Sequence, residues 1–224
     1  MMFKTETHLH TAETSPCSRI GAAEMVRRYK DAGYSTIFVT DHFQLSTIGS
    51  YEDATWEEKT KRFLEGYYVA KREGDRIGVN VLLGAEFNFI EAPNDYLAYG
   101  ISKEFFDKYP DLHTYGIEKF SKVAHENGVF IIQAHPYRDG YGYPTPDYID
   151  AVEVCNTNPR HEDYNEKISA FAKENHLPFS GGSDAHRDAD IGRGGIETET
   201  EIKTVEEFID LIKTGNVNVI RGDV

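Results

Sequence analysis

Short apolar segments alternate with amphipathic segments along most of the chain, and this alternation constrains its fold more than any other feature. Strand-like segments span residues 2–9, 35–40, 79–84, 96–101, 129–133 and 151–155, a seventh short one follows residue 178, and a last one spans 217–220. Segments with apolar residues at helical spacing span residues 21–32, 56–76, 115–127, 163–174 and 205–213. Strands that alternate with helices favour parallel pairing through helical crossovers.

Seven or eight such units in 224 residues predict one α/β domain that covers residues 1–224. We expect a closed or nearly closed, distorted parallel β/α barrel of the TIM-like kind, with about seven strands. The apolar residues are clumped into runs, as strands covered on both faces require. An open, doubly wound sheet is the alternative, because one sequence does not reveal the order of its strands.

Composition narrows the classes of function. No run approaches ~18 consecutive apolar residues, and the start MMFKTETHLH lacks the pattern of a secretory signal, so we expect a cytoplasmic protein without a membrane span. The formal net charge of −14 disfavours binding to nucleic acid, whose phosphates it would repel. Cys17 and Cys155 are too few for a thiolate metal cage, and we expect both to be ordinary reduced thiols.

Residues that ligate metals gather at one end of the predicted strands. In a parallel β/α fold, the C-terminal ends of the strands form the edge where sites are built. Side chains two residues apart on a strand point the same way, with Cα atoms roughly 6.5–7 Å apart, so each such pair can reach one cation. The residues at or just beyond strand ends are His8, His10, His42, His135 and His186, together with Asp41, Glu86 and Asp184.

These side chains predict a metal site. Imidazoles and carboxylates without thiolates suit Zn²⁺, Mn²⁺ or Fe²⁺ better than Ca²⁺ or Mg²⁺. The potential ligands exceed what one tetrahedral ion needs, so we expect two or three divalent ions. Each motif alone also fits a structural role, as a core histidine, a hydrogen-bonded Asp-His pair or a turn, and it is their coincidence on one edge that favours metal. The other four histidines show no such pattern, although His161 follows the sixth predicted strand.

At this point the ordered motifs HLHT (8–11), TDH (40–42), GAEF (84–87), AHP (134–136) and GSDAH (182–186) resemble those of the PHP (polymerase and histidinol phosphatase) family. The resemblance covers nearly the whole chain. It implies a distorted seven-stranded β/α barrel that holds up to three divalent ions. It also implies a phosphoesterase, since stand-alone members are typically phosphoesterases, whereas other members are attached to DNA polymerases.

The resemblance also implies roles for individual residues. His8 and His10 would bind the first ion with Asp184, Glu86 would bridge the first and second ions, and His135 would hold the second. His42 and His186 would hold the third, and Asp41 would orient a neighbouring ligand.

Two departures from the family pattern affect the expected ligands. Many members carry a histidine at the end of the fourth strand, where this chain reads DYLAYGIS (95–102), so water or an unrecognised side chain would complete the second ion. Many members also place a histidine or aspartate a few residues after the first motif. Here the candidates are Glu13 and, less plausibly, Ser15, and Glu13 is either a ligand or a solvated loop carboxylate.

The resemblance leads to a mechanism as a hypothesis. A hydroxide shared by the two ions that Glu86 bridges would attack phosphorus in line. Asn156 would donate a hydrogen bond to the substrate or cap a turn, and either His186 or a metal-bound water would protonate the leaving group. Arginines would offset charge on the phosphate oxygens, with Arg160 as the first choice and Arg138, Arg187 and Arg193 as further candidates.

We therefore expect hydrolysis of a small phosphorylated metabolite, such as histidinol phosphate or a related monoester or diester. One alternative is an amide or ester hydrolase on an amidohydrolase-like barrel, but its usual bridging lysine has no strand-end counterpart here. A nuclease or polymerase-associated module is a second alternative, which the negative charge disfavours. A non-catalytic module is a third, and it predicts broken ligand motifs.

Overall fold

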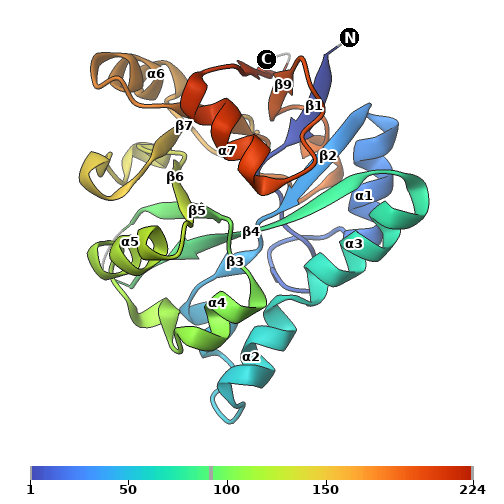
Figure 1. Cartoon of the computed structure of the whole chain (residues 1–224), viewed down its shortest axis with the longest axis vertical. Coiled ribbons are helices and arrows are strands. Elements are labelled where there is room, and N and C mark those ends of the chain that lie inside the picture. The colour runs from blue at the N-terminus through green and yellow to red at the C-terminus, as the bar shows by residue number, and fades with distance from the viewer. Residues whose placement is uncertain (1, 91–92, 223–224) are drawn as a thin grey trace.

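Ten strands form one sheet that curves into a nearly closed barrel in the computed structural model, which describes residues 2–90 and 93–222 (Figure 1). The strands are β1 (Phe3–Glu6), β2 (Tyr34–Val39), β3 (His42–Phe43), β4 (Asn80–Asn88), β5 (Asp95–Tyr99), β6 (Phe130–Ala134), β7 (Ala151–Asn156), β8 (Phe179–Gly182), β9 (Ile196–Thr198) and β10 (Asn218–Val219). The α-helices are α1 (Ala22–Asp31), α2 (Trp56–Phe63), α3 (Glu65–Ile77), α4 (Lys103–Lys108), α5 (Ile117–Glu126), α6 (Asn165–Glu174) and α7 (Val205–Thr214).

The strand order confirms the barrel-like α/β architecture expected from the sequence. The strands follow the order β10-β9-β1-β2-β4-β5-β6-β7-β8, and β3 pairs with β4. A parallel bridge between Leu9 and Ala185 joins the segments that follow β1 and β8, and the amide of His10 donates to the carbonyl oxygen of Ala185 at 3.0 Å. This bridge makes a ring of β1, β2, β4, β5, β6, β7 and β8. The antiparallel β9 and β10 extend from β1 outside that ring.

The expectation of parallel barrel strands needs a correction at β5, which runs antiparallel to both of its neighbours. Only six residues separate β4 from β5, and a parallel connection needs a crossover of a dozen or more. The reversal places the first residue of β5, Asp95, opposite Asn88 of β4 and Ala134 of β6. The beginning of β5, rather than its end, therefore lies at the edge where the other strands end.

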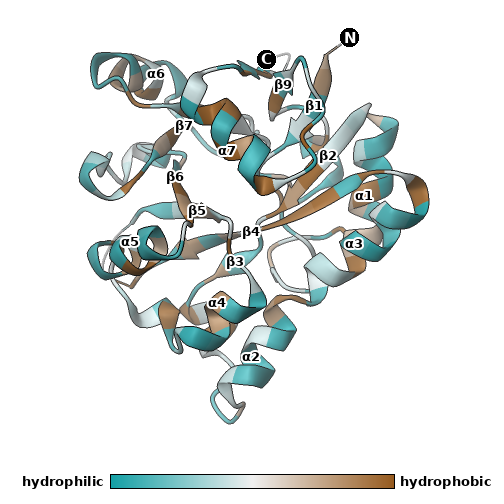
Figure 2. Ribbon diagram, in the orientation of Figure 1, coloured by the Kyte–Doolittle hydropathy of each residue, from teal (hydrophilic) through white to brown (hydrophobic). Residues whose placement is uncertain are grey.

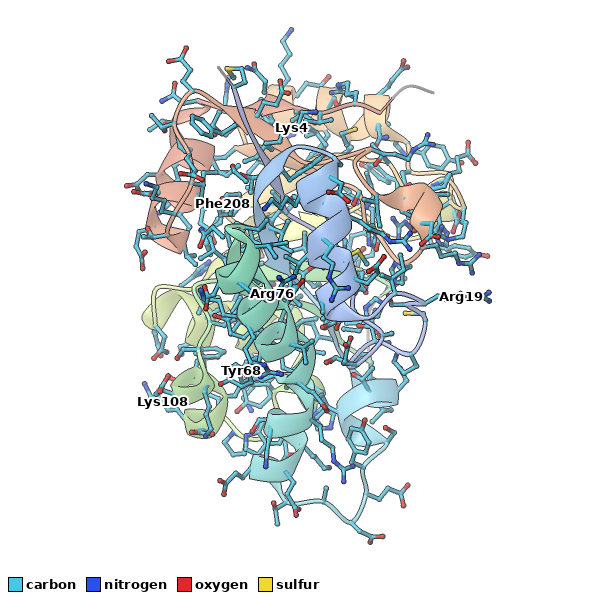
Figure 3. All side chains as sticks on the ribbon, turned by 90° about the vertical axis from the view of Figure 1, so that its right-hand side faces the viewer. Lys4, Arg19, Tyr68, Arg76, Lys108 and Phe208 are labelled. Carbon is cyan, nitrogen blue, oxygen red and sulfur yellow. The ribbon has the colours of Figure 1, made fainter. Side chains whose placement is uncertain are left out.

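Helices cover the outside of the barrel, and α1 and α3 lie side by side on one face of it (Figure 3). The Nε of Arg27 on α1 donates to Glu73 on α3 at 2.7 Å. The single helix expected at 56–76 is instead two, α2 and α3, which meet at Leu64. Just beyond this break, a Cβ on Gly66 would lie 2.0 Å from Thr11 Oγ1, so glycine lets α3 pass close to the segment after β1.

The apolar core lies between the barrel strands and the inner faces of the helices. Figure 2 shows hydrophobic residues along β1, β4 and β6 and hydrophilic ones on the outer surface of α6. Phe43, Phe87 and Phe106 are fully buried, and the ring centroid of Phe43 lies 4.8 Å from that of Phe87 and 5.0 Å from that of Phe106. No helix in the described ranges combines the length and the apolar character that crossing a membrane requires.

Candidate metal centre

Glu86 on β4 lies at the centre of a cluster of four histidine rings. Its Oε1 is 3.2 Å from His8 Nε2 and 3.1 Å from His135 Nε2. Its Oε2 is 3.4 Å from His10 Nε2 and 2.7 Å from His42 Nδ1. Burial alone would raise the pKa of Glu86, but the positive charges of His8 and His42 hold it well below its usual range. The structure thus brings segments from β1, β3, β4 and β6 to one carboxylate.

A second carboxylate, Asp184, approaches two of the same histidines, His8 and His10, and also His186. Its Oδ1 is 3.1 Å from His10 Nε2 and 3.5 Å from His8 Nε2, and 3.3 Å from His186 Nδ1. Three groups of side chains have ligand atoms within 4.8 Å of one another: His8, His10 and Asp184; His8, Glu86 and His135; and His10, His42 and His186. Because His8 and His10 are each shared by two groups, the three groups adjoin.

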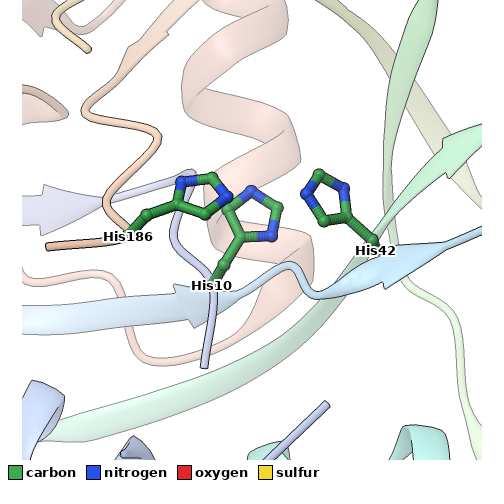
Figure 4. Close-up of side chains that lie close together, drawn as sticks. All are labelled: His10, His42 and His186. Carbon is green, nitrogen blue, oxygen red and sulfur yellow. The ribbon is translucent and has the colours of Figure 1, made fainter. Parts of the chain in front are cut away.

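The third group consists of three imidazoles side by side (Figure 4). The ring centroid of His10 lies 4.1 Å from that of His42 and 4.2 Å from that of His186. Charge repulsion from His42 and His186 adds to the effect of burial and lowers the pKa of His10 well below its usual range. His10 is therefore held neutral, the form in which imidazole ligates metals.

Several buried atoms of the cluster lack a hydrogen bond of acceptable geometry. They are Nε2 of His8, Nε2 of His10, Nδ1 of His42 and Oε2 of Glu86. Buried polar atoms are nearly always hydrogen-bonded, whereas here ring nitrogens and carboxylate oxygens converge without hydrogen-bond geometry. Divalent cations would satisfy these atoms, and the mixture of imidazole and carboxylate fits zinc, manganese or iron.

Glu153 on β7 also contacts this cluster, although the pattern of strand ends in the sequence does not predict it. Its Oε1 lies 3.0 Å from Nδ1 of His8. Its Oε2 accepts hydrogen bonds from the amide of His135 at 3.0 Å and from Nδ2 of Asn156 at 2.9 Å. Burial would raise the pKa of Glu153, but the charge on His8 lowers it. In the neutral form of His8, a proton on Nδ1 would bind this carboxylate and leave Nε2 to act as a ligand.

We expect Glu153→Gln to lower metal affinity or turnover by about 10–100-fold, as losses of such supporting carboxylates do. An amide oxygen can replace one acceptor, but its NH₂ group would face the donors of His135 and Asn156. Isothermal titration with Zn²⁺ would measure the change, with the exposed Glu166→Gln on α6 as the matched control. Equal affinities in the two variants would contradict this role.

Asp95 is a second residue that the sequence analysis did not single out. Its Oδ2 lies 3.8 Å from Nε2 of His135, and the residue lines the same cavity as Glu86. Burial and the charge of Glu86 raise the pKa of Asp95. The segment 95–102 has no histidine at its C-terminal end, so the sequence left the second ion to be completed by water or an unrecognised side chain. The reversed direction of β5 instead brings the aspartate at its beginning to the cluster.

Asp41 is buried beside the cluster and holds the loop after β1. The amide and hydroxyl of Thr11 donate to its two oxygens at 2.6 and 2.7 Å, and the hydroxyl of Ser15 donates to it at 2.7 Å. Ser15 Oγ also accepts a hydrogen bond from the amide of His42 at 3.0 Å. The environment of Asp41 is thus that of a residue that positions its neighbours.

The structure places three candidate residues away from the cavity. Glu13 accepts hydrogen bonds from the amide of Ala22, at 2.8 and 3.0 Å, and so caps α1; a carboxylate is stabilised there by the exposed amides of the helix. Asn156 is buried against Glu153, whereas Asn158 lines the cavity and its Nδ2 lies 3.2 Å from Oδ2 of Asp184. Arg193 packs beside Gly222.

The other three arginines line the cavity, whose volume is about 400 Å³. The Nη2 of Arg138 lies 2.8 Å from Oδ2 of Asp184. Arg160 forms a two-bond pair with the buried Asp190, at 2.6 and 2.8 Å. Arg187 is exposed. Carboxylates thus hold two of the three guanidinium groups at the cavity wall.

The backbone is strained at two of the candidate ligands. His135 has φ of 26° and Asp184 has φ of 51°, in the left-handed region that non-glycine residues rarely adopt. Such strain gathers at functional sites, where surrounding structure maintains it. At His135, the hydrogen bond from its amide to Glu153 is part of that structure.

Cys17 also lines the cavity. Burial would raise the pKa of its thiol, but interactions with the rings of His186 and His42 lower it to about 6. Cys17 is a free thiol, as the sequence predicts, and its surroundings depend on how the loop between β1 and α1 folds back.

Some known proteins are similar to this chain in sequence or in fold. Residues 162–217 match the PHP_C family model, described as PHP-associated. No curated protein matches the chain significantly. The chain shares its fold with a two-domain protein from Bacteroides vulgatus that contains a predicted PHP-like metal-dependent phosphoesterase, with a TM-score of 0.73 and 14% identity over 99% of this chain and 65% of that one.

Two further solved structures have similar folds. One is PsfC from Pseudomonas syringae, with a TM-score of 0.68 and 19% identity over 93% of this chain and 88% of that one. The other is the lesion-specific endonuclease PfuEndoQ from Pyrococcus furiosus, with a TM-score of 0.65 and 17% identity over 98% of this chain and 58% of that one. At these identities the similarity establishes the fold. The segment that matches the PHP-associated family model, residues 162–217, and the shared fold agree with the resemblance of the ordered ligand motifs to the PHP family.

Proposed function

We propose that the chain is a metal-dependent phosphoesterase that hydrolyses a small phosphorylated molecule. The observation that carries this proposal is Glu86, whose carboxylate faces four histidine rings within 3.4 Å at a cavity that arginines also line. In such a cavity, bound cations and the neighbouring guanidinium groups would both face the oxygens of a phosphate.

The three groups of ligands support two or three divalent ions of zinc, manganese or iron. The first group is His8, His10 and Asp184, and the second is Glu86 and His135 with His8; we propose that Asp95 completes the second. When bound, the ions would lower the pKa of a water molecule and offset the charge of the phosphate. Glu86 presents one oxygen to His8 and His135 and the other to His10 and His42, an arrangement that suits a bridging ligand.

The arginines support phosphate as the recognised group. Guanidinium groups donate pairs of hydrogen bonds that match the oxygens of phosphate. Arg138 and Arg160 are held in position by Asp184 and Asp190, and the exposed Arg187 can reach a bound ligand without breaking such a pair. Fixed donors lose little conformational entropy when a substrate binds.

The size of the cavity and the net charge of the chain support a small substrate. A cavity of about 400 Å³ is in the range of small-molecule sites. A surface with net charge −14 repels a polymeric phosphate backbone. We therefore favour a phosphorylated metabolite, of the size of histidinol phosphate, over nucleic acid.

Turnover of a substrate panel tests the proposal. The panel would contain phosphomonoesters, phosphodiesters, a DNA oligonucleotide, carboxylic esters and amides, each with added Mn²⁺ or Zn²⁺ and with a chelated sample as control. We expect phosphate release from at least one small phosphoester and little cleavage of DNA. Hydrolysis of amides or carboxylic esters in the absence of any phosphoesterase activity would contradict the proposal.

A further inference from the structure

Cys17 lies beside the group of three histidines, in the loop between β1 and α1. It lines the cavity together with His42 and His186, and its side chain interacts with both of their rings. A sulfur atom and two imidazoles therefore face one space.

The position of Cys17 is set by the fold. On one side of it, Ser15 Oγ accepts a hydrogen bond from the amide of His42 at 3.0 Å. On the other side, Ser18 Oγ donates to the carbonyl oxygen of His10 at 3.0 Å. The loop is thus tied to the backbone of two histidines of the group, before and after the cysteine.

The histidines themselves provide independent evidence for a ligand. Nε2 of His10 is fully buried and, although it lies 3.1 Å from Oδ1 of Asp184, it makes no hydrogen bond of acceptable geometry. His10 belongs to the group with His42 and His186 that Figure 4 shows. Nδ1 of His186 lies 2.9 Å from the carbonyl oxygen of Asp184. A proton on Nδ1 that binds this oxygen leaves the lone pair of Nε2 available to a cation.

We propose that Cys17 supplies a thiolate ligand to a zinc ion held by His42 and His186, with His10 beside them. This inference rests on the metal centre proposed above. It gives the third group of ligands a different set of donor atoms from the first two groups. The first two groups combine imidazole with carboxylate, which Mn²⁺ and Fe²⁺ also accept. A set of nitrogen and sulfur donors selects Zn²⁺ over Mn²⁺ and Mg²⁺, because thiolates are soft ligands.

Cobalt substitution tests the ligand directly, because a thiolate bound to Co²⁺ produces a charge-transfer band in the near ultraviolet. We expect this band in the wild-type protein and in Cys155→Ser, the control in which the buried cysteine is replaced. Cys17→Ser should lack the band and bind roughly one equivalent less cobalt. Circular dichroism would verify that both variants fold.

The outcomes separate this inference from the proposed function. A band that persists in Cys17→Ser, or full cobalt loading of the wild type without any band, would overturn the role of Cys17 and leave the metal centre intact. Failure to bind cobalt at all would contradict both.

Alkylation provides a second readout that is independent of activity. Cys17 is exposed and Cys155 is buried, so iodoacetamide should modify Cys17 in the metal-free protein. We expect Zn²⁺ to protect Cys17 from this reagent. Equal rates of alkylation with and without Zn²⁺ would contradict the proposal.

Discussion

Glu86→Gln is expected to lower phosphoesterase turnover by more than about 100-fold, because losing even a supporting partner of a ligand costs 10–100-fold. Glu86 is the carboxylate that all four rings of the cluster approach. In glutamine one of the two carboxylate oxygens becomes an NH₂ group, which cannot bind a cation. The substitution preserves the size of the side chain, so the 1% exposed site keeps its packing.

The measurement is steady-state turnover at saturating Mn²⁺ or Zn²⁺, with the melting temperature as a check on folding. Glu166→Gln, an exposed change of the same chemistry on α6, should retain the activity of the parent. If Glu86→Gln turns over as fast as the parent does, Glu86 does not bridge ions.

The main outline of the fold follows from the sequence because the apolar runs and helical spacing are strong local signals. Five expected helical segments are present, with 56–76 divided in two at Leu64. The direction of β5 was missed because strand-like composition carries no information about direction. The short connection between β4 and β5 did carry it, since six residues cannot form a helical crossover.

The histidines of the centre could be found because each follows a strand in the sequence. Glu153 also carries a signal, since a charged residue within the apolar stretch AVEVC must be paired when the strand is buried. The position of Asp95 beside the cluster depends on the direction of β5. The position of Cys17 depends on how a loop folds back over two histidines. Neither position follows from strand pattern or spacing.

The roles of two polar candidates were the least predictable. Glu13 follows the first ligand motif and Asn156 ends β7, yet Glu13 caps α1 and Asn156 supports Glu153. Their partners lie on other elements, so proximity along the chain did not reveal them. Asn158, two residues further on, is the asparagine that lines the cavity.

Metal removal is expected to have the second large effect, on both activity and stability. Ions that bind only the folded chain stabilise it by about 2.7 kcal/mol when their free concentration is 100 times their Kd. For a protein of this size that corresponds to roughly 5–10 °C in melting temperature. We expect exhaustive chelation to lower the melting temperature by this amount and to abolish turnover, and Zn²⁺ or Mn²⁺ to restore both.

The metal content of the reloaded protein, measured by plasma mass spectrometry after removal of free ions, tests the convergence of His8, Glu86, His135 and Asp184 around cations most directly. We predict two or three equivalents of Zn²⁺ or Mn²⁺ in the wild type and fewer in Glu86→Gln. A folded wild-type protein that retains no transition metal, or a Glu86→Gln variant with the same content as the wild type, would contradict this account.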